Sequence, residues 1–296
     1  GSGNFDAAHA AATDAMFNML AALQIDGCIA IGEDRLMDGA APLCQGATFG
    51  PGLMPFDLAV DPIDGTRLLV EGKPGAISVV AIAPRHSIRS IAPADYLDKI
   101  VVDRDGAAVL VPECLDAPAA WTLALIARAK KKAVRDLVVF VLDRPRHAPL
   151  IEEIRSAGAR VMLRGDGDIA GALMAASRRS SVDILMGIGG VPEGIIAACA
   201  VRCLRGAMLA RLAPQSEVER AAITDAGMNL GRILSCKEII NSEHIFFTAT
   251  GIADGPLLDG VRYEGHMAET HSLVLRAETG TRRIIHADHL LSESEE

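Results

Sequence analysis

The chain has 296 residues and a mass of 31.1 kDa, a length that suits one large domain or two joined halves. Half of its residues are hydrophobic and 23% are charged, which allows a sizeable core and excludes a disordered chain. The formal net charge is −9 and the one notable basic run is "RAKKKAVR" at 128–135, so nucleic-acid binding is not expected.

Apolar segments of strand length alternate with helical patterns along the whole chain, which is typical of an α/β protein with α+β character. In the first part, the alanine-rich segment 7–23 is predicted to be a helix. Strands are predicted at 27–34, 56–66 and 76–84, and the first two of them run into acidic residues. Aromatic residues make up only 3%, so the core must consist mainly of small aliphatic side chains.

From about residue 118 the pattern becomes a βαβ alternation. Strands are predicted at 136–143, 160–164 and 182–190, and helices at 148–158, 169–177 and 192–204; further strands are expected at 244–252, 271–277 and 281–285. Glycine and acidic loops follow several of these strands, at the carboxyl ends where open α/β sheets bind ligands. We therefore predict two subdomains around a cleft, 1–117 and 118–296; a return of the C-terminal strands to the first sheet is left open.

The stretch "AVDPIDGTRLL" at 59–69 carries the most informative chemistry. Pro62 lacks an N–H for a strand ladder, so we expect the strand to end at Asp61 and a tight turn to carry Asp64. Gly65 and Thr66 then offer backbone N–H groups to an anion. Two carboxylates beside an anion pocket suit a divalent cation that shares its shell with a phosphate, although Asp-Gly is also common in plain turns.

Other charged residues stand at predicted strand ends. "AIGED" supplies Glu33 and Asp34, and "IGGVPEG" places Glu193 in the first turn of a helix. "DRPRH" supplies Arg144 and Arg146, spaced to hold a phosphate if they are not in a solvated loop. Because an acidic protein must supply positive charge locally to an anionic substrate, these acids and arginines favour one shared cleft.

The six cysteines form no CxxC pair, and we expect them to be reduced thiols of a cytoplasmic protein. Cys199 and Cys203 stand four apart in a helical stretch, where two thiols could meet. We expect no secretory signal and no membrane span, because the apolar stretch 184–201 contains Glu193 and a "GGVPEG" break.

"DPIDGT" resembles the signature of the lithium-sensitive, metal-dependent sugar and inositol phosphatases. The rest of the chain, from roughly Ala10 to Leu290, resembles the GlpX-type, class II fructose-1,6-bisphosphatases. The matching blocks stand in family order: "IDGCIAIGE", "DLAVDPIDGT", "APADYLDKI", "VLDRPRH", "GDGDIAG", "MGIGGVPEG", "TATGIADGPLLDGV" and "TGTRRI". Several such blocks together are far more specific than any one motif.

The resemblance implies a sugar-phosphatase fold of layered helices and sheets, hydrolysis of fructose-1,6-bisphosphate to fructose 6-phosphate and phosphate, and Mn²⁺ or Mg²⁺ as cofactor. It also implies a homo-oligomer, a dimer or tetramer. The implied metal ligands are Glu33, Asp61, Asp64 and Glu193, and Asp61, Asp64 and Thr66 are the implied catalytic residues. Thr66 positions or activates the attacking water. The residues implied to line the scissile phosphate are Asp64, Gly65 and Thr66. Those implied to hold the sugar and the other phosphate are Tyr96, Arg144, Arg146, Asp166, Asp168 and Gly190.

The sequence departs from the family pattern in three places. His9 stands where the family has a metal-binding aspartate, with Phe5 in place of a lysine; histidine suits Mn²⁺ better than Mg²⁺, so His9 is a further candidate ligand. The loop "GEDRLMDGAAPL" has one extra residue and Arg35 in place of an acid. The segment "APQSEVERAAITDAGMN" replaces a longer helical insert.

Three functional readings follow. The leading one is a metal-dependent fructose-1,6-bisphosphatase, with sedoheptulose-1,7-bisphosphate as an additional candidate substrate. A second, suggested by the His9 corner, is a catalytically impaired paralogue that binds sugar phosphates in a regulatory or scaffolding role. A third is a phosphatase for another small ester such as an inositol phosphate; the paired arginines with Tyr96 favour a bisphosphate instead.

Overall fold

A computed structural model of the chain describes residues 3–33, 42–178 and 180–291. Its α-helices are α1 (Phe5–Ala21), α2 (Thr66–Val70), α3 (Arg104–Ala107), α4 (Ala119–Lys130), α5 (Ala148–Ser156), α6 (Asp168–Ala176), α7 (Val191–Cys203), α8 (Glu217–Asp225) and α9 (Cys236–Ile239). Its short 3₁₀ turns are η1 (Pro112–Leu115), η2 (Val134–Asp136) and η3 (Pro145–His147).

Fourteen strands occur among the described residues. They are β1 (Asp26–Ile31), β2 (Thr48–Phe49), β3 (Pro55–Asp64), β4 (Ile77–Pro84), β5 (Tyr96–Val102), β6 (Val138–Leu142), β7 (Arg160–Arg164), β8 (Ile184–Gly190), β9 (Ala207–Leu212), β10 (Ile233–Ser235), β11 (Phe246–Gly251), β12 (Arg262–Glu264), β13 (Met267–Arg276) and β14 (Thr281–Leu290).

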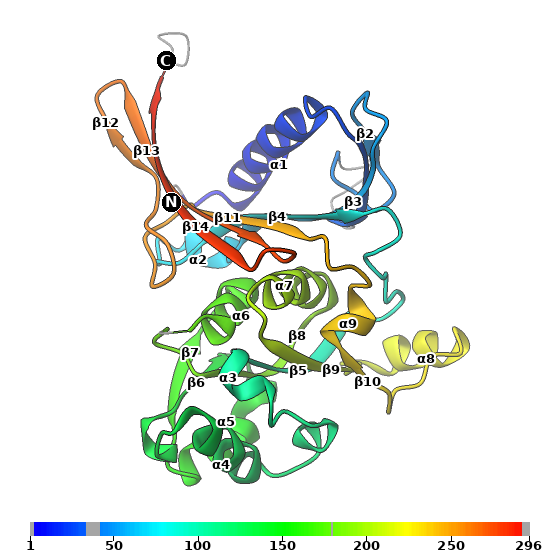
Figure 1. Cartoon of the computed structure of the whole chain (residues 1–296), viewed down its shortest axis with the longest axis vertical. Helices are drawn as coiled ribbons and strands as arrows, with labels where there is room; N and C mark the ends of the chain where they lie inside the picture. The colour runs from blue at the N-terminus through cyan, green and yellow to red at the C-terminus, as the bar shows by residue number, and fades with distance from the viewer. Residues whose placement is uncertain (1–2, 34–41, 179, 292–296) are drawn as a thin grey trace.

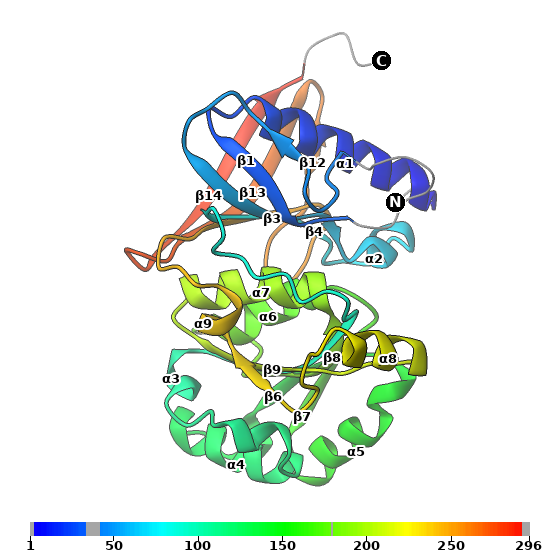
Figure 2. The same ribbon diagram turned by 90° about the vertical axis from the view of Figure 1, so that its right-hand side faces the viewer.

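Helices and sheets alternate in five layers (Figure 1). Helix α1 covers the outer face of one sheet, α6 and α7 lie between the two sheets, and α3, α4 and α5 cover the far face of the second; the view in Figure 2 shows the same stacking. This arrangement confirms the predicted fold class. None of the helices in the described ranges is long and apolar enough to cross a membrane.

The two sheets share the chain unevenly. The eight-stranded sheet has the order β12-β13-β11-β4-β3-β1-β2, with β14 on the free side of β13, and the six-stranded sheet has the order β10-β9-β5-β8-β6-β7. Strand β5 therefore joins the second sheet although it precedes residue 118, and β11 to β14 return to the first sheet. The subdomain division at 117/118 stays a prediction.

The middle layer explains the alanine-rich composition. All nine residues of α6 are buried, because this helix has a sheet on each side and no face toward water. A Cβ added to Gly171 would lie 2.5 Å from the Phe140 ring, so the helix approaches β6 only because this position is glycine.

Most predicted elements are confirmed with small shifts in their bounds, and several were not predicted. Strand β5 and helices α4 and α8 are the main omissions. Strand β5 is buried on both faces for most of its length, so its sequence "YLDKIVV" has no alternating pattern to reveal it. Helix α4 starts after Pro118 without a side-chain cap, which removes the usual start signal.

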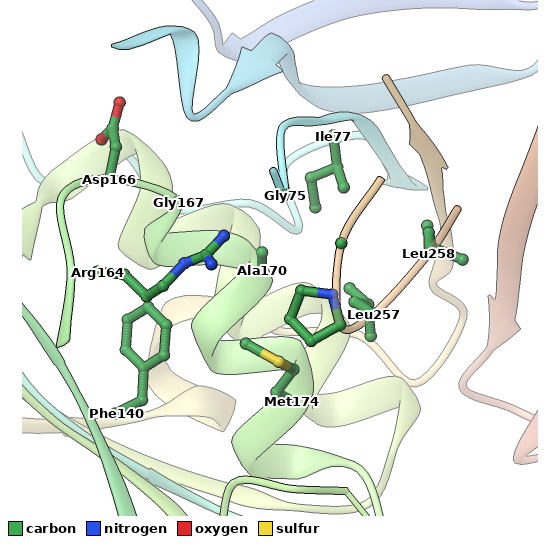
Figure 3. Close-up of a pocket in the computed structure, with 12 residues that line it drawn as sticks. Gly75, Ile77, Phe140, Arg164, Asp166, Gly167, Ala170, Met174, Leu257 and Leu258 are labelled. Carbon is green, nitrogen blue, oxygen red and sulfur yellow. The ribbon is translucent and has the colours of Figure 1, made fainter. Parts of the chain in front are cut away.

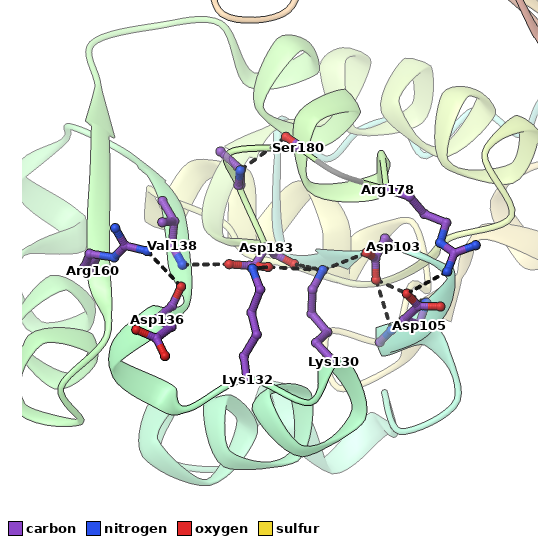
Figure 4. A network of polar contacts seen from close by, with 12 residues as sticks. Asp103, Asp105, Lys130, Lys132, Asp136, Val138, Arg160, Arg178, Ser180 and Asp183 are labelled. Carbon is purple, nitrogen blue, oxygen red and sulfur yellow. Dashed lines mark hydrogen bonds and ion pairs between the residues drawn. The ribbon is translucent and has the colours of Figure 1, made fainter.

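A polar network links one end of the six-stranded sheet, where β5 ends and β8 begins, to the end of α4 (Figure 4). Lys130 Nζ lies 2.7 Å from Asp103 Oδ2, just after β5, and Lys132 Nζ lies 2.6 Å from Asp183 Oδ1, just before β8. Asp183 also accepts a hydrogen bond of 3.0 Å from the Val138 N–H at the start of β6. The basic run at 128–135 thus has a structural role, because two of its lysines attach α4 to the sheet.

A polar contact also joins β7 of the second sheet to the segment that precedes β4 of the first sheet. The Arg164 guanidinium donates to the carbonyl of Pro74, and a Cβ on Gly75, whose φ is +106°, would lie 2.1 Å from Arg164 Nη2. The crevice around it, shown in Figure 3, has a volume of about 10 Å³. It has room for about one water and not for a metabolite.

Candidate functional site

The acidic turn lies at the end of β3, in the first sheet. The expectation that the strand ends at Asp61 is wrong: β3 continues to Asp64, and its pairing with β4 shifts register between Asp61 and Asp64. Pro62 is tolerated because it falls in this irregularity. Gly65, at φ +89°, then turns the chain into the five-residue helix α2.

Asp61 and Asp64 share an environment that opposes their negative charge. Loss of hydration raises the pKa of both carboxyls well above the ordinary value, and repulsion from neighbouring acids, including Glu193, raises it further. Asp64 Oδ2 accepts a bond of 2.9 Å from the Ala170 N–H in α6, and Asp61 Oδ1 accepts one of 2.9 Å from the Ile63 N–H. A cation at this point would relieve the repulsion.

Thr66 stands beside these acids with its hydroxyl hydrogen already used. Its Oγ1 donates to the Ile63 carbonyl at 2.8 Å. The lone pairs of this oxygen therefore remain as acceptors toward the cleft, which allows Thr66 to hold a water molecule by one of its hydrogens.

Two further acids complete the group. Glu193, in the first turn of α7, has a buried Oε2 without a hydrogen-bond partner among the described residues, and burial raises the pKa of this carboxyl. Glu33, after β1, accepts a bond of 3.0 Å from the Thr13 hydroxyl, and His9 Nε2 lies 2.8 Å from its Oε2. Burial raises the pKa of Glu33, while His9 opposes that rise.

The arginines lie on the second sheet, after β6. The Arg146 guanidinium stacks 5.1 Å above the Tyr96 ring and donates to the Ile188 carbonyl at 3.0 Å. Arg144 donates to the Gly165 carbonyl and lies 3.7 Å from Asp166 Oδ1. The carboxyl ends of β6, β7 and β8 meet here as predicted, whereas β5 is antiparallel to β8 and brings its amino end, Tyr96, to the same edge.

Asp168 has a partner that sequence reasoning missed. Lys99 Nζ lies 2.6 Å from Asp168 Oδ2, and its side chain is only 1% exposed. A Cβ on Gly189 would lie 2.0 Å from Asp168 Oδ2 and 2.4 Å from Lys99 Nζ, so this glycine makes space for the pair. Nothing in "YLDKIVV" distinguishes Lys99 from a solvent-facing lysine.

Two more missed residues hold the backbone around the site. Buried His147 accepts from the Ile188 N–H through Nε2 at 2.8 Å, and its Nδ1 contacts the Leu142 carbonyl at 2.7 Å, which fixes a neutral ring with the proton on Nδ1. Burial lowers the pKa of His147. Glu219, buried on α8, accepts from the N–H groups of Asp95 at 2.8 Å and Tyr96 at 3.2 Å.

One cleft of about 820 Å³ joins these groups. Every predicted site residue lines it: His9, Glu33, Asp61, Asp64, Gly65, Thr66, Tyr96, Arg144, Arg146, Asp166, Asp168, Gly190 and Glu193. The first sheet and α7 supply the acids around Asp61, and the second sheet supplies the arginines. In the described part of the chain, no three acidic, histidine or cysteine side chains already form a finished metal site. Asp34 and Arg35 fall outside the described residues.

Comparison with known proteins gives a consistent result over the full length. The family model for bacterial fructose-1,6-bisphosphatase, glpX-encoded, matches residues 1–289. The class 2 fructose-1,6-bisphosphatase of Haemophilus influenzae is 36% identical, with 99% of this chain and 91% of the relative covered. Fructose-1,6-bisphosphatase 1 class 2 of Escherichia coli K12 is 35% identical, with 100% and 90% covered.

Proposed function

This chain belongs to the family of glpX-encoded bacterial fructose-1,6-bisphosphatases, and we propose that its cleft hydrolyses the 1-phosphate of fructose-1,6-bisphosphate to give fructose 6-phosphate and phosphate. One observation carries the proposal: acids on one wall and arginines on the other line a single cleft of about 820 Å³. That volume falls within the range of about 300–1,000 Å³ usual for small-molecule sites.

The acidic wall fits a divalent cation. Four carboxylates gather there, burial and mutual repulsion raise the pKa of Asp61 and Asp64, and Glu193 Oε2 has no partner. Oxygen donors of this kind are the ligands that Mg²⁺ and Mn²⁺ take in proteins. We propose Glu33, Asp61, Asp64 and Glu193 as ligands, with His9 reaching the site through Glu33. When bound, such a cation neutralises charge on the transferring phosphoryl group and the leaving alkoxide.

The opposite wall binds the rest of the substrate. We assign the second phosphate to Arg144 and Arg146, whose planar guanidinium groups match phosphate oxygens, and the sugar hydroxyls to Asp166 and Asp168. Holding this remote phosphate orients the 1-phosphate toward the acidic wall. Thr66 then holds the attacking water by one hydrogen, the water oxygen attacks phosphorus, and the bond from phosphorus to the sugar oxygen breaks. One proton of the water ends on the leaving sugar oxygen, which gives the free hydroxyl and inorganic phosphate.

The proposal also includes the cofactor, the cellular compartment and the oligomeric state. The ion is Mn²⁺ or Mg²⁺; direct binding by His9, which lines the cleft beside Glu33, would favour Mn²⁺ because imidazole suits Mn²⁺ better than Mg²⁺. All six cysteines are free, which fits a reducing cytoplasm. We also propose a homo-oligomer. Sedoheptulose-1,7-bisphosphate, with the same two terminal phosphates, is a second candidate substrate.

The alternative of a catalytically impaired paralogue finds no support. The full-length relatives at 35–36% identity are themselves called fructose-1,6-bisphosphatases. In this chain the departure at His9 leaves Asp61, Asp64, Glu193 and Thr66 in the cleft.

The test is phosphate release from fructose-1,6-bisphosphate with Mn²⁺, with Mg²⁺ or without metal. We expect metal-dependent release that falls at least a hundredfold in Thr66→Ala and is largely kept in Thr66→Ser, the matched control that retains the hydroxyl. His9→Asp should shift the preference toward Mg²⁺. Release that is independent of metal, or unchanged in Thr66→Ala, would reject the assignment.

A further inference from the structure

Strand β14 forms an uncovered edge of the eight-stranded sheet. It pairs with β13 over its whole length, from Thr281 opposite Arg276 to Leu290 opposite Met267. None of the described strands pairs with its other side, and Figure 1 shows β12, β13 and the C-terminal end of β14 at the left margin of the molecule. A ten-residue edge strand presents a row of unpaired N–H and C=O groups, which is a template for another strand.

The side chains of β14 do not block this edge. The strand contains no lysine or proline, the residues that most often protect an edge, and Ile284, Ile285 and Leu290 are 38%, 43% and 79% exposed. Arg282 and Asp288 are also exposed, and neither forms an ion pair with any described residue. The edge therefore has apolar area and unpaired charges of both signs.

We propose that β14 pairs in antiparallel fashion with β14 of a second copy of this chain, around a two-fold axis at Ile285. Such an axis is perpendicular to the sheet, so residues of the same face oppose each other and the two copies use one self-complementary surface. With the axis at Ile285, Arg282 lies opposite Asp288 of the partner subunit, and the pair occurs twice in the interface.

The pairing of opposite charges and the length of the overlap favour an axis at Ile285 over an axis at His286 or Ala287. An axis at His286 instead places Arg282 opposite Leu290 of the partner subunit and the two His286 rings opposite each other. An axis at Ala287 shortens the overlap to 284–290. The register at Ile285 keeps 281–289 paired and joins the two eight-stranded sheets into one. Because β11 to β14 contribute no residue to the cleft, the pairing leaves both cleft openings free.

The first test is the mass of the intact chain in solution, measured by light scattering. We expect an assembly of at least twice 31.1 kDa. Arg282→Glu and Asp288→Arg should each halve the assembled mass, and the double variant should restore it, because the charge pair is rebuilt in reverse. Phosphate release in each variant reports that the chain is folded. A monomeric parent chain, or an assembly that neither single variant alters, overturns the proposal.

The second test reads the register by oxidative cross-linking. Ile285→Cys places two thiols on the axis, where Cα atoms of directly opposed residues lie about 4.5–5.5 Å apart, within disulfide reach. Arg283→Cys is the matched control, because its two copies lie four residues apart along the strands, or about 13 Å. A covalent dimer from Ile285→Cys and none from Arg283→Cys or the parent chain supports the register. Equal cross-linking of the two variants, or none from Ile285→Cys, overturns it.

Discussion

Replacing Lys99 by methionine gives the sharpest test of how the cleft is supported. The substitution keeps the aliphatic stem of the side chain but removes the ammonium that lies 2.6 Å from Asp168 Oδ2, where the two side chains are 1% and 7% exposed. Removing one member of a buried ion pair strands the other charge, which destabilises a protein by about 3–5 kcal/mol. We expect a loss of that size in the free energy of unfolding, measured by urea denaturation at pH 7.5.

Two matched variants separate this explanation from a general effect of lysine loss. Lys132→Met removes a contact of the same 2.6 Å length, but Lys132 is 40% exposed and Asp183 keeps Lys130 at 3.4 Å, so we expect a loss of only about 0–1 kcal/mol. The double variant Lys99→Met/Asp168→Asn removes the stranded charge and should recover a large part of the stability.

Kinetics supply an independent readout, because Asp168 lines the cleft. If Lys99 holds Asp168 in position for the sugar, Lys99→Met should raise KM for fructose-1,6-bisphosphate more than it lowers kcat. A loss of stability below about 1 kcal/mol in Lys99→Met, or a loss equal to that in Lys132→Met, would refute the reasoning from burial.

Three further outcomes follow from the site. Glu193→Gln should weaken Mn²⁺ binding at least tenfold in calorimetry yet stabilise the metal-free chain by about 1–3 kcal/mol, because it neutralises a buried, unpartnered oxygen. An unchanged affinity for Mn²⁺ would contradict the metal assignment, and a less stable metal-free chain would contradict the reasoning from burial. Arg146→Lys keeps the charge but loses the planar group that stacks on Tyr96, so KM for the bisphosphate should rise roughly tenfold, and an unchanged KM would remove Arg146 from the phosphate site. Burial lowers the pKa of His147, so as pH falls below 6.5 the unfolded chain binds a proton at this residue before the folded chain does, and the free energy of unfolding should drop by up to about 1.4 kcal/mol per pH unit. His147→Gln should lose less stability between pH 7.5 and pH 5.5 than the parent chain. Equal losses would exclude His147 as the source of the pH dependence.

The centre of the acidic wall was predictable from sequence because its chemistry is local, whereas Glu33 and Glu193 come from distant segments. Asp61, Asp64 and Thr66 stand within six residues, at the end of β3 and the start of α2, and the family resemblance assigned the same positions. The same local reasoning placed the strand end wrongly at Asp61, because it treated Pro62 as a stop. A register shift in the β3–β4 pairing instead accommodates Pro62 and lets the strand continue to Asp64.

The supporting residues were not predictable, because their roles depend on contacts between distant segments. Lys99 and Asp168 are 69 residues apart, and Glu219 holds Asp95 from 124 residues away. The direction of strand β5 places the residues in both cases. Because β5 runs antiparallel to β8, Tyr96 reaches the edge of the cleft and Lys99 lies beneath it. A single sequence records the identity of these side chains but not the direction of the strand that carries them.

The two glycines of "IGGVPEG" show where this limit lies. Their pattern indicated a turn before a helix, yet β8 continues through Gly190 and α7 begins at the next residue. A side chain would be crowded at both positions: a Cβ on Gly189 would lie 2.0 Å from Asp168 Oδ2, and a Cβ on Gly190 would lie 2.0 Å from Glu193 Oε2. One glycine therefore makes space for Asp168 on the wall with the arginines, and the other makes space for Glu193 on the acidic wall. Because adjacent residues of a strand face opposite sides, the end of β8 can separate these two walls by a single residue.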